Sequence, residues 1–169
     1  MSNRSYQSRV SANPAPSASV LVQFVSASDS AVATGTVAWV FDDTIPQNTE
    51  GDQFMSKAIT PKNANNTLLI EAILCMSSDT ALESIGVALF QDTTADALAA
   101  MYNHGSATAA SNHIITLRHV MTAGTIVSTE FKIRAGVQAA GILTFNGASG
   151  ARTMGGVMGS ILTIAELSS

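Results

Sequence analysis

Residues 67–76 read TLLIEAILCM, a run that is typical of a β-strand. In an extended strand, successive side chains point to opposite faces, so one face here is wholly apolar: Leu68, Ile70, Ala72, Leu74 and Met76. The opposite face carries Leu69, Glu71, Ile73 and Cys75 and is also largely apolar. An antiparallel strand with one solvated face alternates apolar and polar residues, so a cover is expected over the second face. Either a loop of the same chain or a neighbouring copy would supply it.

Other runs show the same period of two. In residues 130–138, four apolar side chains (Phe131, Ile133, Ala135 and Val137) alternate with four polar ones (Glu130, Lys132, Arg134 and Gln138). Residues 20–25 suit a strand, and residues 37–41 place Val37, Trp39 and Phe41 on one face of another. Turn-forming pairs separate the runs, among them Ala123-Gly124, Asn146-Gly147 and Gly155-Gly156. Many short strands with frequent turns predict an all-β antiparallel sandwich.

The composition limits the classes of partner. The chain has 169 residues, which fits one domain, and 46% of them are hydrophobic. Only 12% are charged, about half the share of an ordinary globular domain, so we expect copies of the chain to cover part of its surface. The net charge of −4, without a basic run, argues against nucleic acid and anionic membranes as partners.

No apolar segment reaches the roughly 18 residues that span a bilayer, so no membrane insertion is expected. Residues 1–10 also lack the apolar core of a signal peptide, which predicts no export by the general secretory route. Residues 11–19, SANPAPSAS, combine two prolines with small polar residues and cannot hold a regular element. We therefore expect a tether or shaft remnant over residues 1–19 and a head domain over residues 20–169.

Residues 41–167 resemble the C-terminal head of bacteriophage tail fibres. The resemblance covers roughly three quarters of the chain and rests on LLIEA (68–72), ALFQDTTADALAA (88–100), LRHVMTAGT (117–125), FKIRAG (131–136), FNGASGAR (145–152) and GGVMGSILTIAEL (155–167). It implies a homotrimeric jelly roll, similar to complement globular heads and tumour-necrosis-factor-like domains, at the tip of a virion fibre. Such a head touches a bacterial surface polysaccharide or outer-membrane component. It also implies that residues 94–101, the one helical candidate, form a strand edge.

The residues offer no catalytic or metal centre. Residues 147–151, GASGA, depart from the G-x-S-x-G nucleophile motif at the last position, Ala151, and lack a following helix. His113 and His119 share one strand face but lie about 20 Å apart, too far to bind one ion. The acidic residues Asp42, Asp43, Glu50 and Asp52 are better explained by a solvated turn held by its own side chains than by calcium. We expect no enzymatic activity, cofactor or metal.

Four polar or aromatic residues are the candidate receptor-binding site, because no core pattern explains them. Tyr102, Asn103, His104 and Asn112 flank the small-residue loop 105–111. Recognition commonly uses such loops on a rigid scaffold. Two functions remain open: a trimeric head that binds a host receptor, and a purely structural trimerisation or capping module of a virion fibre.

Overall fold

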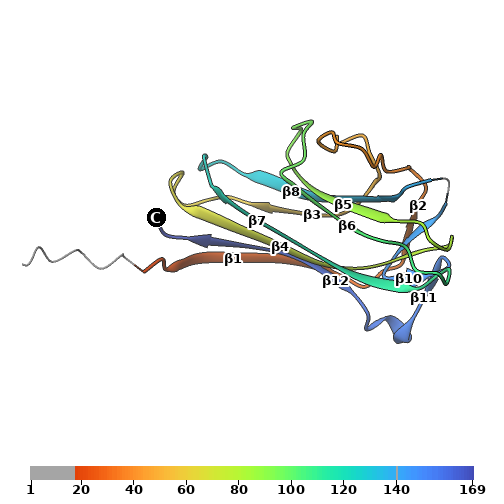
Figure 1. Ribbon diagram of the computed structural model, residues 1–169. Helices are drawn as coiled ribbons and strands as arrows, with labels where there is room; N and C mark the ends of the chain where they lie inside the picture. The colour runs from red at the N-terminus through yellow and green to blue at the C-terminus, as the bar shows by residue number, and fades with distance from the viewer. Residues whose placement is uncertain (1–17, 140) are drawn as a thin grey trace, which may run out of the picture.

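The computed structural model describes residues 18–139 and 141–169, and it arranges all but two of their strands in two antiparallel sheets that face each other (Figure 1). The first sheet contains, in spatial order, β1 (Leu21–Asp29), β12 (Ser160–Leu167), β4 (Thr67–Ser78) and β7 (Asn112–Thr122). The second contains β3 (Asp52–Ile59), β8 (Thr129–Val137), β5 (Ile85–Gln91) and β6 (Ala99–Asn103). The predicted all-β antiparallel sandwich is confirmed.

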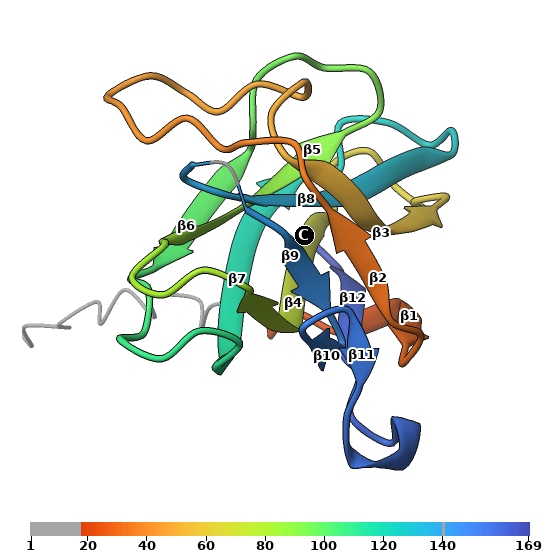
Figure 2. The ribbon, with the colours of Figure 1, turned by 90° about the vertical axis from the view of Figure 1, so that its right-hand side faces the viewer.

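The chain passes repeatedly from one sheet to the other, which gives the strand order of a jelly roll. Short β9 (Leu143–Phe145) pairs with the last residues of β4, on the same side as β12, and β2 (Ala33–Gly35) pairs with β9. The hairpin of β10 (Gly147–Ala148) and β11 (Ala151–Arg152) leads into the short 3-10 helix η1 (Met154–Gly156). Figure 2 shows the loop around η1 projecting from the side of the sandwich opposite the loops next to β5.

The apolar face predicted for residues 67–76 forms the centre of the core. Leu68, Ile70, Ala72, Leu74 and Met76 of β4 are fully buried. They belong to one cluster with inward side chains of the facing sheet, namely Ile85, Val87 and Leu89 of β5 and Phe131, Ile133, Ala135 and Val137 of β8. The inside–outside alternation expected over residues 130–138 is therefore confirmed along β8.

Residues 37–41 do not form the predicted strand. The backbone N–H of Trp39 donates to the carbonyl of Val137 at 2.8 Å, but no ladder follows. The segment instead crosses the outward face of the second sheet, because Gly86 and Gly136 leave space there. A Cβ on Gly136 would lie 2.6 Å from the carbonyl oxygen of Val37. Alternation here places Trp39 and Phe41 against that face, while Val37 is 42% exposed.

Residues 94–101 form no helix. Residues 92–98 make a loop with a turn at its start, and β6 begins at Ala99, as the strand-edge prediction required. The tether predicted over residues 1–19 lies outside the described residues, except for Ala18 and Ser19. In the part of the chain that the structure describes, no helix has the length and apolar character to cross a membrane.

Candidate functional site

Two loops lie together over the outward face of the second sheet. The N–H of Asn48 donates to the carbonyl of Ala95 at 2.8 Å, and the N–H of Ala97 donates to that of Pro46 at 3.0 Å. The side-chain amide of Gln47 reaches the carboxylate of Asp96 at 2.9 Å. Residues 36–51 and 92–98 are thus joined, and Figure 2 shows both above β5.

A second, small core fixes these two loops, residues 36–51 and 92–98 and together called the double loop, on the sheet. Trp39 is only 5% exposed and packs with Ala88 and Phe90, the outward side chains of β5. Phe41 and Ala97 pack against the same cluster. The core holds the loop's backbone in place, so side chains at its edge have defined positions.

A groove of about 420 Å³ separates the double loop from β6. Its lining residues are Trp39, Val40, Phe41, Asp42, Thr44, Pro46, Ala100, Met101 and Tyr102. Tyr102 is 65% exposed, and its ring meets Phe41 edge to face, with centroids 5.8 Å apart and an interplanar angle of 88°. An exposed aromatic ring beside polar groups is typical of a ligand-binding surface.

Of the four candidate receptor-binding residues, only Tyr102 lines this groove. Asn103 is half-buried and pairs with Ile85 across β6 and β5. His104 is exposed, with Nδ1 3.3 Å from the carbonyl oxygen of Gly105. Asn112 opens β7 in the first sheet. The structure therefore joins Tyr102 to residues 39–46, which sequence reasoning did not select, and leaves the other three outside the groove.

The acidic residues next to the groove hold their own turn, as predicted. Asp42 Oδ1 accepts hydrogen bonds from the hydroxyl (2.5 Å) and the N–H (2.8 Å) of Thr44. These bonds, the hydroxyl first, lower the pKa of Asp42. Asp52 accepts the N–H groups of Thr36 and Val37, and Glu50 accepts those of Gln47 and Val40. Among the described residues, no three potential metal ligands gather.

The outward face of the first sheet has a different character. Cross-strand registers place Phe24, Ala165, Leu69 and Val120 in one row and Ser28, Ile161, Ile73 and Thr116 in another. Between the two rows lies the ion pair of Glu71 and Arg118 at 3.4 Å. Phe24 is 58% exposed, Ile73 47% and Val120 56%, so nothing in the described part of the chain covers this face.

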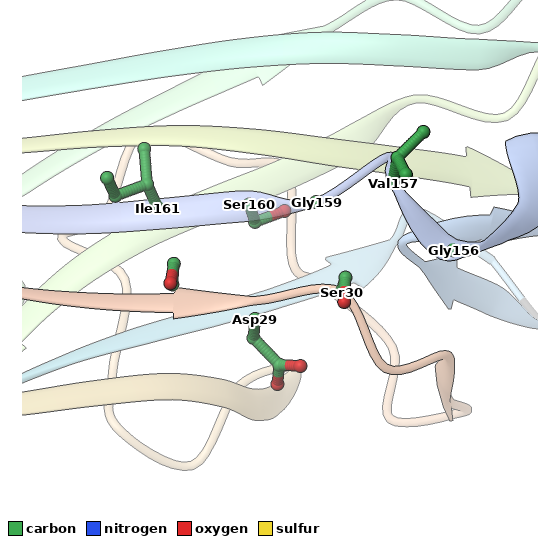
Figure 3. Close-up of a pocket in the computed structure, with 8 residues that line it drawn as sticks. Asp29, Ser30, Gly156, Val157, Gly159, Ser160 and Ile161 are labelled. Carbon is green, nitrogen blue, oxygen red and sulfur yellow. The ribbon is translucent and has the colours of Figure 1, made fainter.

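A second hollow, about 320 Å³ in volume, lies where β1 and β12 meet residues 156–159. Figure 3 shows Asp29 and Val157 on its lining pointing in opposite directions. The carboxylate of Asp29 accepts the N–H of Ala31 at 2.7 Å, within its own loop. Backbone and small side chains make up most of the wall, so this hollow lacks a convergent set of polar groups.

The remaining chemically distinctive side chains stand apart. His113 and His119 lie on one face of β7, as predicted, and burial lowers the pKa of His119. Cys75 is half-buried because it faces outward on β4, and its partial burial raises the pKa of its thiol. Ser149 lies in the turn between β10 and β11, so a strand follows it and not the helix that a nucleophile elbow requires.

Comparison with known proteins places the chain in no family. No family model and no curated protein sequence matches it. Among solved structures, the Gx strain of infectious bursal disease virus is 11% identical, with 86% of this chain and 37% of that chain covered and a TM-score of 0.38. Dimeric latent PorU from Porphyromonas gingivalis is 8% identical, with 92% of this chain and 14% of that chain covered and a TM-score of 0.42. Tailspike protein 4 of bacteriophage CBA120 is 12% identical, with 74% of this chain and 19% of that chain covered and a TM-score of 0.30. The chain spans less than two fifths of each of these structures, and TM-scores this low assign no fold family.

Proposed function

We propose that the protein is the homotrimeric head of a phage tail fibre and binds a receptor on the bacterial surface. The observation that supports this function best is the contrast between the two outward faces of the sandwich. One is apolar and uncovered by the described residues, while the other carries a fixed double loop and a groove with one exposed aromatic ring, that of Tyr102. Such a division separates an assembly surface from a recognition surface.

The outward face of β1, β12, β4 and β7 is the proposed subunit interface. Glu71 and Arg118 are the charged side chains at the outward positions of these four described strands, and their charges cancel. Apolar and small side chains surround the pair. Covering such a face with another copy removes apolar surface from water without leaving an unpaired charge. The number of subunits, three, is taken from the resemblance to tail-fibre heads.

The groove between residues 39–46 and β6 is the proposed receptor contact. Three copies in a trimer present three grooves, so weak single contacts combine through multivalency. A rigid loop also avoids much of the entropy loss that ordering on binding would cost. This function requires binding and no reaction, which agrees with the expected lack of enzymatic activity.

The experiment is to label the purified protein and incubate it with a panel of bacterial strains that includes the phage's host. The proposal predicts staining of the host and of strains that share its surface components, and competition with phage adsorption. The alternative, a purely structural trimerisation or capping module, rests on the apolar face alone. A stable trimer that stains no strain and blocks no adsorption would favour that alternative.

A further inference from the structure

The floor of the groove offers a hydrogen-bond donor with no protein partner. Trp39 is 95% covered, yet its indole Nε1–H finds no acceptor among the described residues. Every fully buried side-chain nitrogen or oxygen in that part of the chain has a hydrogen-bond partner, so Nε1 is not fully buried. Tyr102 pairs with Gly86, on which the indole rests, so its ring rises beside the indole. The open donor and the aromatic wall are therefore neighbours.

The rim of the groove is acidic. Asp42 is the one charged residue among the lining residues, and its Oδ1 is engaged by Thr44 while Oδ2 has no donor among the described residues. Nearby cationic groups are committed to loop carbonyls. Arg134 donates to the carbonyls of Glu50 (3.0 Å) and Gly51 (2.5 Å), and Lys132 donates to that of Asp92. Neither Arg134 nor Lys132 is among the lining residues, so an anionic ligand in the groove would meet the carboxylate of Asp42.

We infer, on the basis of the proposed receptor-binding function, that this groove takes a neutral pyranose of the host surface and discriminates against the corresponding uronic acid. A pyranose hydroxyl accepts the indole N–H of Trp39, and a second hydroxyl donates to Asp42. The C–H face of the sugar packs against the exposed ring of Tyr102. The groove volume of about 420 Å³ lies in the range of small-ligand sites, roughly 300–1,000 Å³.

The test uses the indole N–H as a reporter, since Trp39 is the single tryptophan of the chain. The full-length ¹⁵N-labelled protein is titrated with the methyl glycosides of glucose, galactose and mannose at millimolar concentrations. The methyl glycosides of the three matching uronic acids are titrated in parallel. At least one neutral glycoside is expected to shift the single indole cross-peak, and its uronide to bind roughly tenfold more weakly through like-charge repulsion.

Two variants and a control sharpen the test. Asp42→Asn should reduce the preference for the neutral sugar to less than roughly threefold, because it removes the repulsion. Tyr102→Ala should weaken binding of both sugars, whereas His104→Ala, outside the groove, should leave both unchanged. A uronide that binds as tightly as its neutral partner would overturn the inference. So would an unshifted indole peak with every neutral glycoside while the labelled protein still stains cells, an outcome that leaves the receptor-binding proposal standing.

Discussion

Trp39 rests directly on Gly86: a Cβ added to this glycine would lie 2.5 Å from both Cδ1 and Nε1 of the indole. Gly86 also pairs with Gly136 across β5 and β8, so two residues without side chains lie next to each other on the outward face of the second sheet. The segment 36–51 occupies the space that side chains would otherwise fill. This contact between a ring and a glycine positions the floor of the groove.

Gly86→Ala is expected to displace Trp39 and to loosen the double loop, because the contact cannot accommodate a methyl group. Such overpacking costs typically about 1–3 kcal/mol. Thermal melting and the emission of the single tryptophan measure the change. In a Trp39→Ala background the same glycine substitution should cost much less. Equal costs in the two backgrounds, measured as a double-mutant cycle, would contradict the contact.

Ile70 and Ile73 lie three residues apart on β4 and face opposite ways. Ile70 is fully buried, so Ile70→Asp places an unpaired charge in the core and should cost several kcal/mol, enough to unfold a marginal domain. Ile73→Asp places the same charge on the exposed outward face. That variant should keep its β-sheet circular dichroism but lose the trimer. An Ile70→Asp protein that melts within a few degrees of the parent would show that Ile70 does not point into the core.

Tyr102 and His104 separate the groove from the neighbouring loop. Tyr102→Ala should leave the trimer and its melting temperature nearly unchanged, because the ring is 65% exposed, yet it should reduce staining of host cells. The reduction is multiplied across the subunits of a multivalent head. His104→Ala should bind like the parent. If His104→Ala or Asn112→Ala lowered cell binding and Tyr102→Ala did not, recognition would belong to the loop 105–111.

Glu166 is a buried carboxylate that joins three parts of the chain. It accepts hydrogen bonds from the side-chain amides of Gln23 (2.5 Å) and Asn66 (2.7 Å) and from the backbone N–H groups of Lys62 (2.8 Å) and Asn63 (3.2 Å). Burial raises the pKa of Glu166, but the hydrogen bonds outweigh burial and lower it overall. The turn before β4 is thereby tied to the last strand.

Because the folded-state pKa of Glu166 lies below its unfolded value of about 4.3, its stabilising effect is complete above that value and is lost as pH falls through the folded pKa. At pH 7, Glu166→Gln should cost about 2 kcal/mol in unfolding free energy. The difference in melting temperature between parent and variant should shrink as pH falls below about 5. Asp43→Asn, at an exposed carboxylate, is the control with little difference at any pH. A gap that stays constant down to pH 3 would exclude this linkage.

The sequence predicted the strands whose side chains alternate, because burial of one face imposes a period of two. It failed over residues 37–41, where alternation reflected packing on a sheet face rather than pairing at a sheet edge. The glycines that make this packing possible, Gly86 and Gly136, lie 50 positions apart in the sequence, and only the strand register reveals that they adjoin. For the same reason, Tyr102 was found from sequence whereas its proximity to Phe41 and Asp42 was not.

The mass of the purified protein in solution, measured by multi-angle light scattering, tests the proposed trimer. The uncovered apolar face of β1, β12, β4 and β7 predicts that copies of the chain associate, and the tail-fibre resemblance gives their number as three. Three copies of the 17.4 kDa chain make a particle of about 52 kDa. The Ile73→Asp variant should instead give the mass of one chain. A parent protein that remains a 17.4 kDa monomer at micromolar concentration would contradict the assembly and, with it, the proposed fibre head.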